Sequence, residues 1–161
     1  MPRTTPRWTY HLERSQLLPL PIDEAFAFFA DAGNLEALTP PTLRFRMLTP
    51  APIAMQAGAL IDYRLKVHGM PVRWRTEIVA WEPGRRFVDR QLRGPYALWE
   101  HTHSFEPVDG GTLMRDVVVY RLPLGPFGAL ANRLLVAADL RRIFDFRRDA
   151  FARLLAPRLD T

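Results

Sequence analysis

Apolar and polar residues alternate through most of the chain with the spacing of β-strands. Residues 58–69 place four apolar side chains on one face of such a strand: Ile61, Tyr63, Leu65 and Val67. Comparable runs occupy residues 8–21, 42–50, 72–83, 85–92, 95–108 and 112–123. Short turns join most of these runs, and Asp109-Gly110 is a typical hairpin turn. The pattern predicts about seven strands forming one antiparallel sheet.

A short helical unit is expected directly after the first strand. Asp23 can cap a helix, and the apolar residues of this helix are Ala25, Phe26, Phe28 and Phe29. Ala32-Gly33-Asn34 should break the helix. A second short helix is expected at about residues 35–38, before Pro40 and Pro41.

The C-terminal part of the chain has helical spacing over a longer range. Residues 127–155 contain no proline, and large apolar side chains recur there at helix-like intervals: Leu130, Leu134, Leu140, Phe144, Phe151 and Leu155. This predicts one amphipathic helix roughly 40 Å long. A strongly curved sheet with one such helix across its concave face cannot meet the helix everywhere. We therefore expect an α+β domain, spanning residues 1–161, with a ligand cavity between sheet and helix.

Composition and charge narrow the classes of function. Hydrophobic residues make up 48% of the 161 residues and there is no cysteine, so we expect a folded protein without disulfides, thiolate catalysis or cysteine-based zinc sites. No apolar run approaches the roughly 20 residues that span a bilayer, and the N-terminal residues do not resemble a secretory signal. We therefore expect a cytoplasmic protein without integral membrane association.

The chain is basic, with 22 Lys and Arg against 17 Asp and Glu. The arginines are interspersed with acidic residues and form no continuous tract, which is typical of a solvated surface, so no nucleic-acid partner is predicted. An interaction module that binds a membrane or a protein through the basic C-terminal helix is the alternative. Its binding would depend on ionic strength.

The strongest candidate for chemistry is the stretch GPYALWEHTHSF, residues 94–105. Strand alternation places Trp99, His101, His103 and Phe105 on one face. The two large aromatic side chains favour the buried side of the sheet. Both histidines should therefore point inward.

A two-residue turn at Asp109-Gly110 fixes the register across the following hairpin. The expected pairs are Phe105–Met114, His103–Asp116, His101–Val118 and Trp99–Tyr120. A change of one residue in this loop would turn the opposite face inward. The neighbouring strand adds Phe87, Asp89 and Gln91 on one face. The predicted ligand-binding residues are Tyr63, Trp74, Phe87, Asp89, Gln91, Trp99, His101, His103, Phe105, Asp116, Tyr120, Leu140 and Phe144.

Three interpretations of the two histidines remain open. With Asp116 or Asp89 they could bind a metal ion, but a His-x-His pair alone is a weak signal, so neither a metal nor a cofactor is predicted. Alternatively, His101 or His103 with Asp116 could act in acid–base catalysis. The third interpretation is a hydrogen-bonded network that is structural or orients a ligand. We favour the third because it requires the fewest further residues.

The order of strands and helices resembles the helix-grip fold of the START-like superfamily, also called SRPBCC or polyketide-cyclase-like proteins. Three stretches of the sequence are similar to sequences of a bacterial ligand-binding subgroup: LPLPIDEAFAFFADAGNLEALTPP, RWRTEIVAWEPGRRFVDRQLRGPYALWEHTHSFEPVDGGT and YRLPLGPFG. The resemblance covers nearly the whole chain. It implies a cavity that binds a lipid, a polyketide, an aromatic compound or another largely apolar molecule. The alternative that it implies is a cyclase, aromatase or dehydratase. No oligomeric state is predicted.

Overall fold

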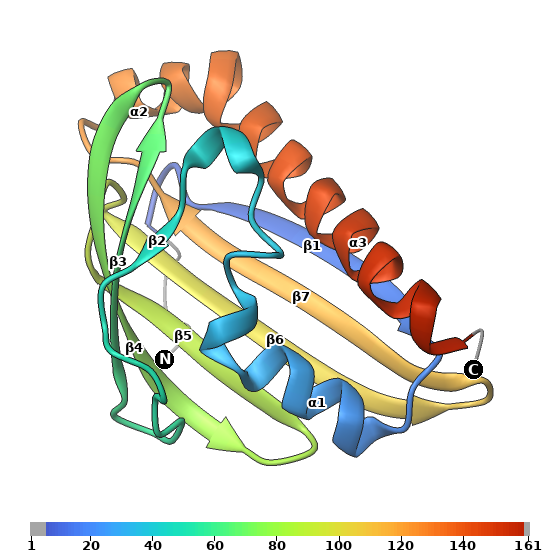
Figure 1. Cartoon of the computed structure of the whole chain (residues 1–161). Coiled ribbons are helices and arrows are strands. Elements are labelled where there is room, and N and C mark those ends of the chain that lie inside the picture. Colours follow the sequence, from blue (N-terminus) through green and yellow to red (C-terminus); the bar gives the residue numbers. More distant parts are fainter. Residues whose placement is uncertain (1–5, 160–161) are drawn as a thin grey trace, which may run out of the picture.

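The structure, a computed structural model, describes residues 6–159, so residues 1–5 and 160–161 of the predicted domain lie outside it (Figure 1). The sheet is formed by β1 Tyr10–Leu18, β2 Arg46–Met47, β3 Leu60–Val67, β4 Met70–Glu82, β5 Arg86–Arg93, β6 Leu98–Val108 and β7 Gly111–Arg121. The helical elements are α1 Ile22–Ala30, the 3₁₀ helices η1 Ala32–Asn34 and η2 Pro41–Leu43, α2 Pro126–Ala131, the π-helical η3 Asn132–Val136, and α3 Ala137–Leu159.

The seven strands form one antiparallel sheet in the order β1-β7-β6-β5-β4-β3-β2. All neighbours in the chain from β2 to β7 are neighbours in the sheet, and β1 closes the other edge beside β7. The predicted register of the last hairpin is confirmed, because His103 lies opposite Asp116 and Trp99 opposite Tyr120. The helix-grip architecture is confirmed as well, with α3 running across the concave face of the sheet (Figure 1).

A β-bulge in β4 changes which side chains face inward. Ile78 pairs with Asp89 but Ala80 pairs with Val88, so Val79 is the extra residue. Before the bulge, even-numbered residues such as Trp74 and Ile78 are buried on the inner face. After it, the odd-numbered Trp81 packs against Phe26 of α1, with ring centroids 5.3 Å apart. The bulge therefore bends the strand and lets its far end close onto α1.

The core is divided between the ends of α3. Phe151 and Leu155 of its C-terminal half pack in a cluster with α1 and with residues of β5, β6 and β7: Phe87, Phe105 and Met114. Its N-terminal half carries Leu140 and Phe144 into a second cluster around Trp74 and Trp99. The cavity lies along this N-terminal half, because Leu140 and Phe144 also line it.

The helical unit after β1 differs from the prediction in its boundaries. The helix α1 begins at Ile22 with Pro21 at its N-cap position and without a side-chain cap, so the prediction that Asp23 caps it is wrong. The second short helix is η1, three residues earlier than the expected residues 35–38. Asp31 causes the shift, because its Oδ1 accepts a hydrogen bond from the backbone N–H of Gly33 at 2.8 Å.

The strand predicted at residues 42–50 is reduced to β2, which has two residues. Pro40 and Pro41 fix the backbone in a conformation that suits the 3₁₀ helix η2. Arg44 ends that helix with a left-handed conformation, φ 44°. The alternation of apolar residues around Phe45 thus arises mainly from a loop that packs against β3 rather than from a strand.

Candidate functional site

A cavity of about 960 Å³ lies between the sheet and α3. Its wall is largely apolar and is formed by the inner faces of β3 to β6, by α3 and by the segment around η1 and η2. Aromatic rings follow one another along this wall: Phe45 and Tyr63 are 4.9 Å apart, Tyr63 and Trp74 5.9 Å, and Trp74 and Trp99 5.3 Å. Such a chamber suits a small apolar molecule better than a polar one.

One end of the cavity reaches the surface beside the turn between β3 and β4. His68 of this turn lines the cavity, and its Nε2 lies 2.7 Å from Oδ2 of Asp139 on α3. Met70 also lines this end and is 71% exposed. The contact between His68 and Asp139 thus ties the tip of the sheet to the helix at the mouth.

A network of two histidines and two aspartates lies on three neighbouring strands, β5, β6 and β7. Both histidines are buried, at 4% exposure for His101 and 3% for His103. Each histidine forms its hydrogen bond with the aspartate that is not directly opposite it in the sheet. His101 lies opposite Asp89 in the sheet, but its Nε2 donates to Asp116 Oδ1 at 2.9 Å. His103 lies opposite Asp116, and its Nε2 donates to Asp89 Oδ2 at 2.8 Å. Diagonal neighbours on a twisted sheet are within reach of long side chains.

The remaining ring nitrogens differ in their surroundings. Nδ1 of His103 lies 3.0 Å from Asp116 Oδ1, without the alignment of a hydrogen bond, and the ring is stacked on Phe87 with centroids 4.2 Å apart. Nδ1 of His101 is farther from a carboxylate, at 3.6 Å from Asp89 Oδ2. His103 is therefore enclosed by its partners, whereas His101 keeps one nitrogen for another contact.

Burial and partners shift the pKa values of the network in different directions. Burial would raise the pKa of Asp116, but its contacts with His101 and His103 hold it well below the ordinary value, and the pKa of Asp89 is lowered in the same way. Burial lowers the pKa of His101, assisted by the charge of His103. Burial would also lower the pKa of His103, but Asp116 and Asp89 raise it overall. These directions favour ionised carboxylates at Asp89 and Asp116, and protonation of His103 at a higher pH than His101.

These shifts predict how stability depends on pH. The carboxylates of Asp89 and Asp116 have lowered pKa values, so the unfolded state takes up protons first and stability falls as the pH drops below about 4. Near pH 6.5 the contributions of His101 and His103 oppose one another, because only the pKa of His103 is raised. Urea unfolding between pH 3 and 8 should show a larger loss of stability below about pH 4 than any change around pH 6–7, where the two histidines oppose one another. The variant Asp116→Asn should lose less stability on acidification; an unchanged acidic slope would contradict the assignment.

Two tyrosines line the cavity as neutral groups. Burial raises the pKa of Tyr63, and the negative charge of Asp89 raises it further. Burial also raises the pKa of Tyr96. Both phenols therefore stay protonated at neutral pH and offer O–H donors to a ligand.

The structure places most of the predicted ligand-binding residues on the wall of the cavity. These are Tyr63, Trp74, Phe87, Asp89, Trp99, His101, His103, Leu140 and Phe144. Their contact with a ligand stays a prediction. The other four lie away from the wall. Asp116 is behind the histidines, Phe105 packs against Phe26, and the hydroxyl of Tyr120 donates to Asn132 Oδ1 at 2.9 Å.

Gln91 lies away from the wall because it supports the turn between β5 and β6. Its Nε2 donates to the carbonyl of Tyr96 at 2.8 Å, and its Oε1 accepts from the backbone N–H of Tyr96 at 3.2 Å. A side chain that satisfies both groups of one residue's backbone has little left for a ligand.

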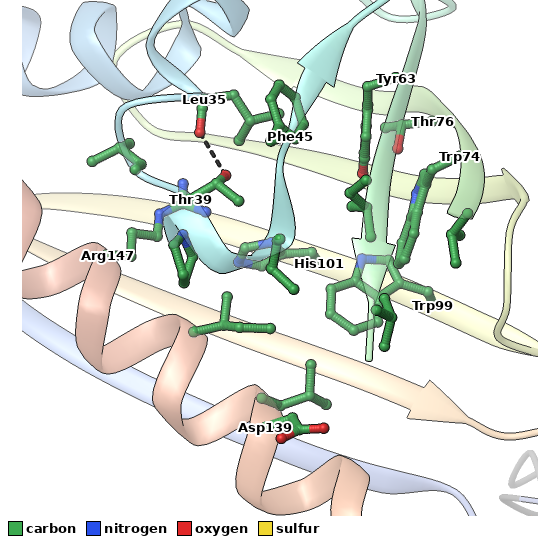
Figure 2. A pocket seen from close by; sticks show the side chains of 18 of the residues that line it. Leu35, Thr39, Phe45, Tyr63, Trp74, Thr76, Trp99, His101, Asp139 and Arg147 are labelled. Carbon is green, nitrogen blue, oxygen red and sulfur yellow. Dashed lines mark hydrogen bonds between the residues drawn. The ribbon is translucent and has the colours of Figure 1, made fainter. Parts of the chain in front are cut away.

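The cavity also contains a residue that the charge pattern of the sequence assigns to the solvated surface. Arg147 of α3 lines the cavity (Figure 2). A signal for it exists in the spacing of the helix. Leu140, Phe144, Phe151 and Leu155 form an apolar stripe, and the turn between Phe144 and Phe151 is filled by Arg147. A charged residue in an apolar stripe is a candidate for a function inside the protein.

Three members of the network could in principle hold a metal ion. Asp89, His101 and His103 each offer one ligand atom, and these atoms lie within 4.8 Å of one another. In the structure, however, Nε2 of His103 and Oδ2 of Asp89 are used for each other at 2.8 Å.

The fold and the cavity define a helix-grip protein with an internal chamber between sheet and helix. The chain belongs to the family described as polyketide cyclase/dehydrase and lipid transport, whose sequence model matches residues 9–156. The resemblance to the START-like superfamily is thereby confirmed. A comparison with curated proteins gives no match.

Several solved structures are similar to this one over nearly their whole length. The Zhui aromatase/cyclase from Streptomyces sp. R1128 has a TM-score of 0.72 and 18% identity, covering 94% of this chain and 96% of its own. CV1439 from Chromobacterium violaceum has a TM-score of 0.70 and 14% identity, covering 90% and 96%. TTHA0849 from Thermus thermophilus has a TM-score of 0.67 and 21% identity, covering 92% and 99%. At these identities the similarity concerns the fold.

Among residues 6–159, none of the helices combines the length and the apolar character needed to cross a lipid bilayer.

Proposed function

We propose that this protein binds a small, largely apolar ligand, such as a lipid, a polyketide or an aromatic compound, in the cavity between the sheet and α3. The observation that carries the proposal is the cavity itself, about 960 Å³ in volume and walled mainly by apolar and aromatic side chains. Pockets of 300–1,000 Å³, roughly, are typical of small-molecule sites. Family membership supports the same function.

Within this proposal the network of Asp89, His101, His103 and Asp116 is a fixed polar patch in an apolar chamber. Its carboxylates and Nε2 nitrogens satisfy one another, so the patch does not need a ligand to be stable. It orients a ligand through His101, whose Nδ1 is the least engaged nitrogen. The wall of aromatic rings supplies the area of contact.

Two measurements test the proposal. Native mass spectrometry of the protein as purified should show a bound small molecule. After extraction, the neutral fluorophore N-phenyl-1-naphthylamine should bind saturably with one site per chain. The proposal is wrong if no molecule co-purifies and the fluorophore shows no saturable binding.

An enzyme of cyclase, aromatase or dehydratase type is the second candidate, and one observation favours it. Burial is the main cause of the lowered pKa of His101. Because Nε2–H of His101 donates to Asp116, Nδ1 could act as a base. The enclosed His103 is less suited to this role. The enzyme function is supported if the wild-type protein speeds exchange of the α-protons of 2-tetralone in D₂O and His101→Gln loses this activity with unchanged affinity for the ketone. Equal exchange rates for the two proteins would reject it.

A further inference from the structure

Arg147 lies in the middle of α3, is partly buried and lines the cavity. It follows Phe144 by three residues and precedes Phe151 by four, so all three lie on one side of the helix. Both phenylalanines are buried, at 6% and 2% exposure. Figure 2 shows the Arg147 side chain reaching from α3 toward the segment that holds Thr39. Its guanidinium lies over the ring of Phe29, 5.5 Å from the centroid.

The guanidinium has no anionic partner in the described part of the chain. Its Nε is buried and makes no hydrogen bond. The adjacent Arg148, on the outer side of α3, forms a salt bridge with Asp149 at 2.9 Å. A buried donor without an acceptor is unfavourable, so the free guanidinium is suited to an acceptor that arrives with a ligand.

The two aspartates nearest in the site do not take this role. Oδ1 of Asp116 and Oδ2 of Asp89 are each held between the two histidines. Arg147 affects the two aspartates through its positive charge, which is among the causes that lower the pKa of both carboxyls. Its fork of N–H donors stays available.

We propose that Arg147 binds an acidic oxygen of the ligand, so that the preferred ligand is an aromatic or polycyclic acid, a carboxylate or an acidic phenol, rather than a neutral apolar molecule. This inference rests on the proposed ligand-binding function and adds a chemical class to it. A guanidinium is the side chain best suited to hold such an anion with two parallel hydrogen bonds.

The layout of the cavity supports a ligand with one acidic end and one aromatic end. Arg147 and the pair Trp74 and Trp99 lie on opposite sides of His101 in Figure 2. The two tryptophan rings are perpendicular, at 89°, and form a corner that suits a flat ring system. A ligand with its acidic group at Arg147 and its rings in this corner would pass the polar patch at His101.

Two fluorophores with one ring skeleton test the proposal directly. The probe 8-anilinonaphthalene-1-sulfonate carries an anionic group, and N-phenyl-1-naphthylamine lacks it. The wild-type protein should bind the sulfonate more tightly. The variant Arg147→Met should lower the affinity for the sulfonate probe by about 10-fold or more, because a hydrogen-bonded ion pair is lost. Binding of the neutral probe should change by no more than about twofold.

A matched variant separates the role of the site from the loss of one positive charge. Arg141 lies on the same helix, is exposed and is not part of the cavity wall. Arg141→Met should therefore leave both affinities unchanged. Arg147→Lys should retain part of the preference, since it keeps the charge and loses the fork. If Arg147→Met does not fold, Arg147→Gln serves as the neutral variant.

The remaining outcomes contradict the proposal in distinguishable ways. Equal weakening of both probes in Arg147→Met would show that Arg147 acts by packing. Equal weakening of the sulfonate in Arg141→Met would show a general effect of charge. If neither probe binds the wild-type protein, the proposed ligand-binding function itself is wrong.

Discussion

Replacing Asp116 by alanine should lower the free energy of unfolding by about 3–5 kcal/mol. Asp116 is 9% exposed and its Oδ1 lies within 3.0 Å of both histidines. Without it, Nε2 of His101 loses its acceptor, and His103 loses the carboxylate oxygen 3.0 Å from its Nδ1 and keeps only Asp89. A buried group that loses its partner cannot recover hydration. Urea unfolding followed by tryptophan fluorescence measures the loss.

The matched control is Asp145→Ala on the surface of α3. Asp145 pairs with Arg14 at 3.3 Å, and the two side chains are 46% and 34% exposed. Water takes over the role of the missing partner there, so the change should lower stability by less than about 1 kcal/mol. Equal losses for the two variants would show that the buried network is not an interdependent unit.

The sequence predicts the inward stripe of β6 well, for a physical reason. Strand alternation has a period of two, and the turn at Asp109-Gly110 fixes which residue of β7 lies opposite which residue of β6. The pair of His103 and Asp116 follows from these two facts and is confirmed. Long-range contacts joined by a tight hairpin are thus accessible to reasoning from spacing alone.

The crossed hydrogen bonds are not accessible in this way. Which histidine donates to which aspartate depends on side-chain torsions and on the local twist between strands. Direct opposition in the sheet would pair His101 with Asp89, yet Nε2 of His101 donates to Asp116. The bulge at Val79 cannot be predicted from spacing either, because the apolar pattern of β4 does not show where the strand gains an extra residue relative to β5.

The position of Arg147 depends on the rotation of α3 about its own axis. Spacing shows that Arg147 falls within the apolar stripe of the helix, but Arg147 and Arg148 are adjacent and either could face inward. The packing of Phe144 and Phe151 decides between them. Arg147 consequently faces the cavity, and Arg148 pairs with Asp149 outside.

Replacing Phe151 by alanine should lower the free energy of unfolding by about 3–5 kcal/mol. Phe151 is 2% exposed, and its ring centroid is 5.1 Å from those of both Phe28 and Phe29. These contacts attach the C-terminal half of α3 to α1, beyond the part of the helix that spans the cavity. Their loss should also speed hydrogen exchange of the α3 amides, as measured by mass spectrometry in urea-free buffer.

Phe127 provides the control, because it is 77% exposed at the other end of the same helical segment. Phe127→Ala should change stability by no more than about 0.5 kcal/mol. If Phe151→Ala speeds exchange in α3 while the amides of β6 and β7 stay protected, the packing against α1 holds the helix over the cavity independently of the sheet. If α3 and the sheet exchange together, the helix has no separate anchor, and the chamber can open only when the whole fold does.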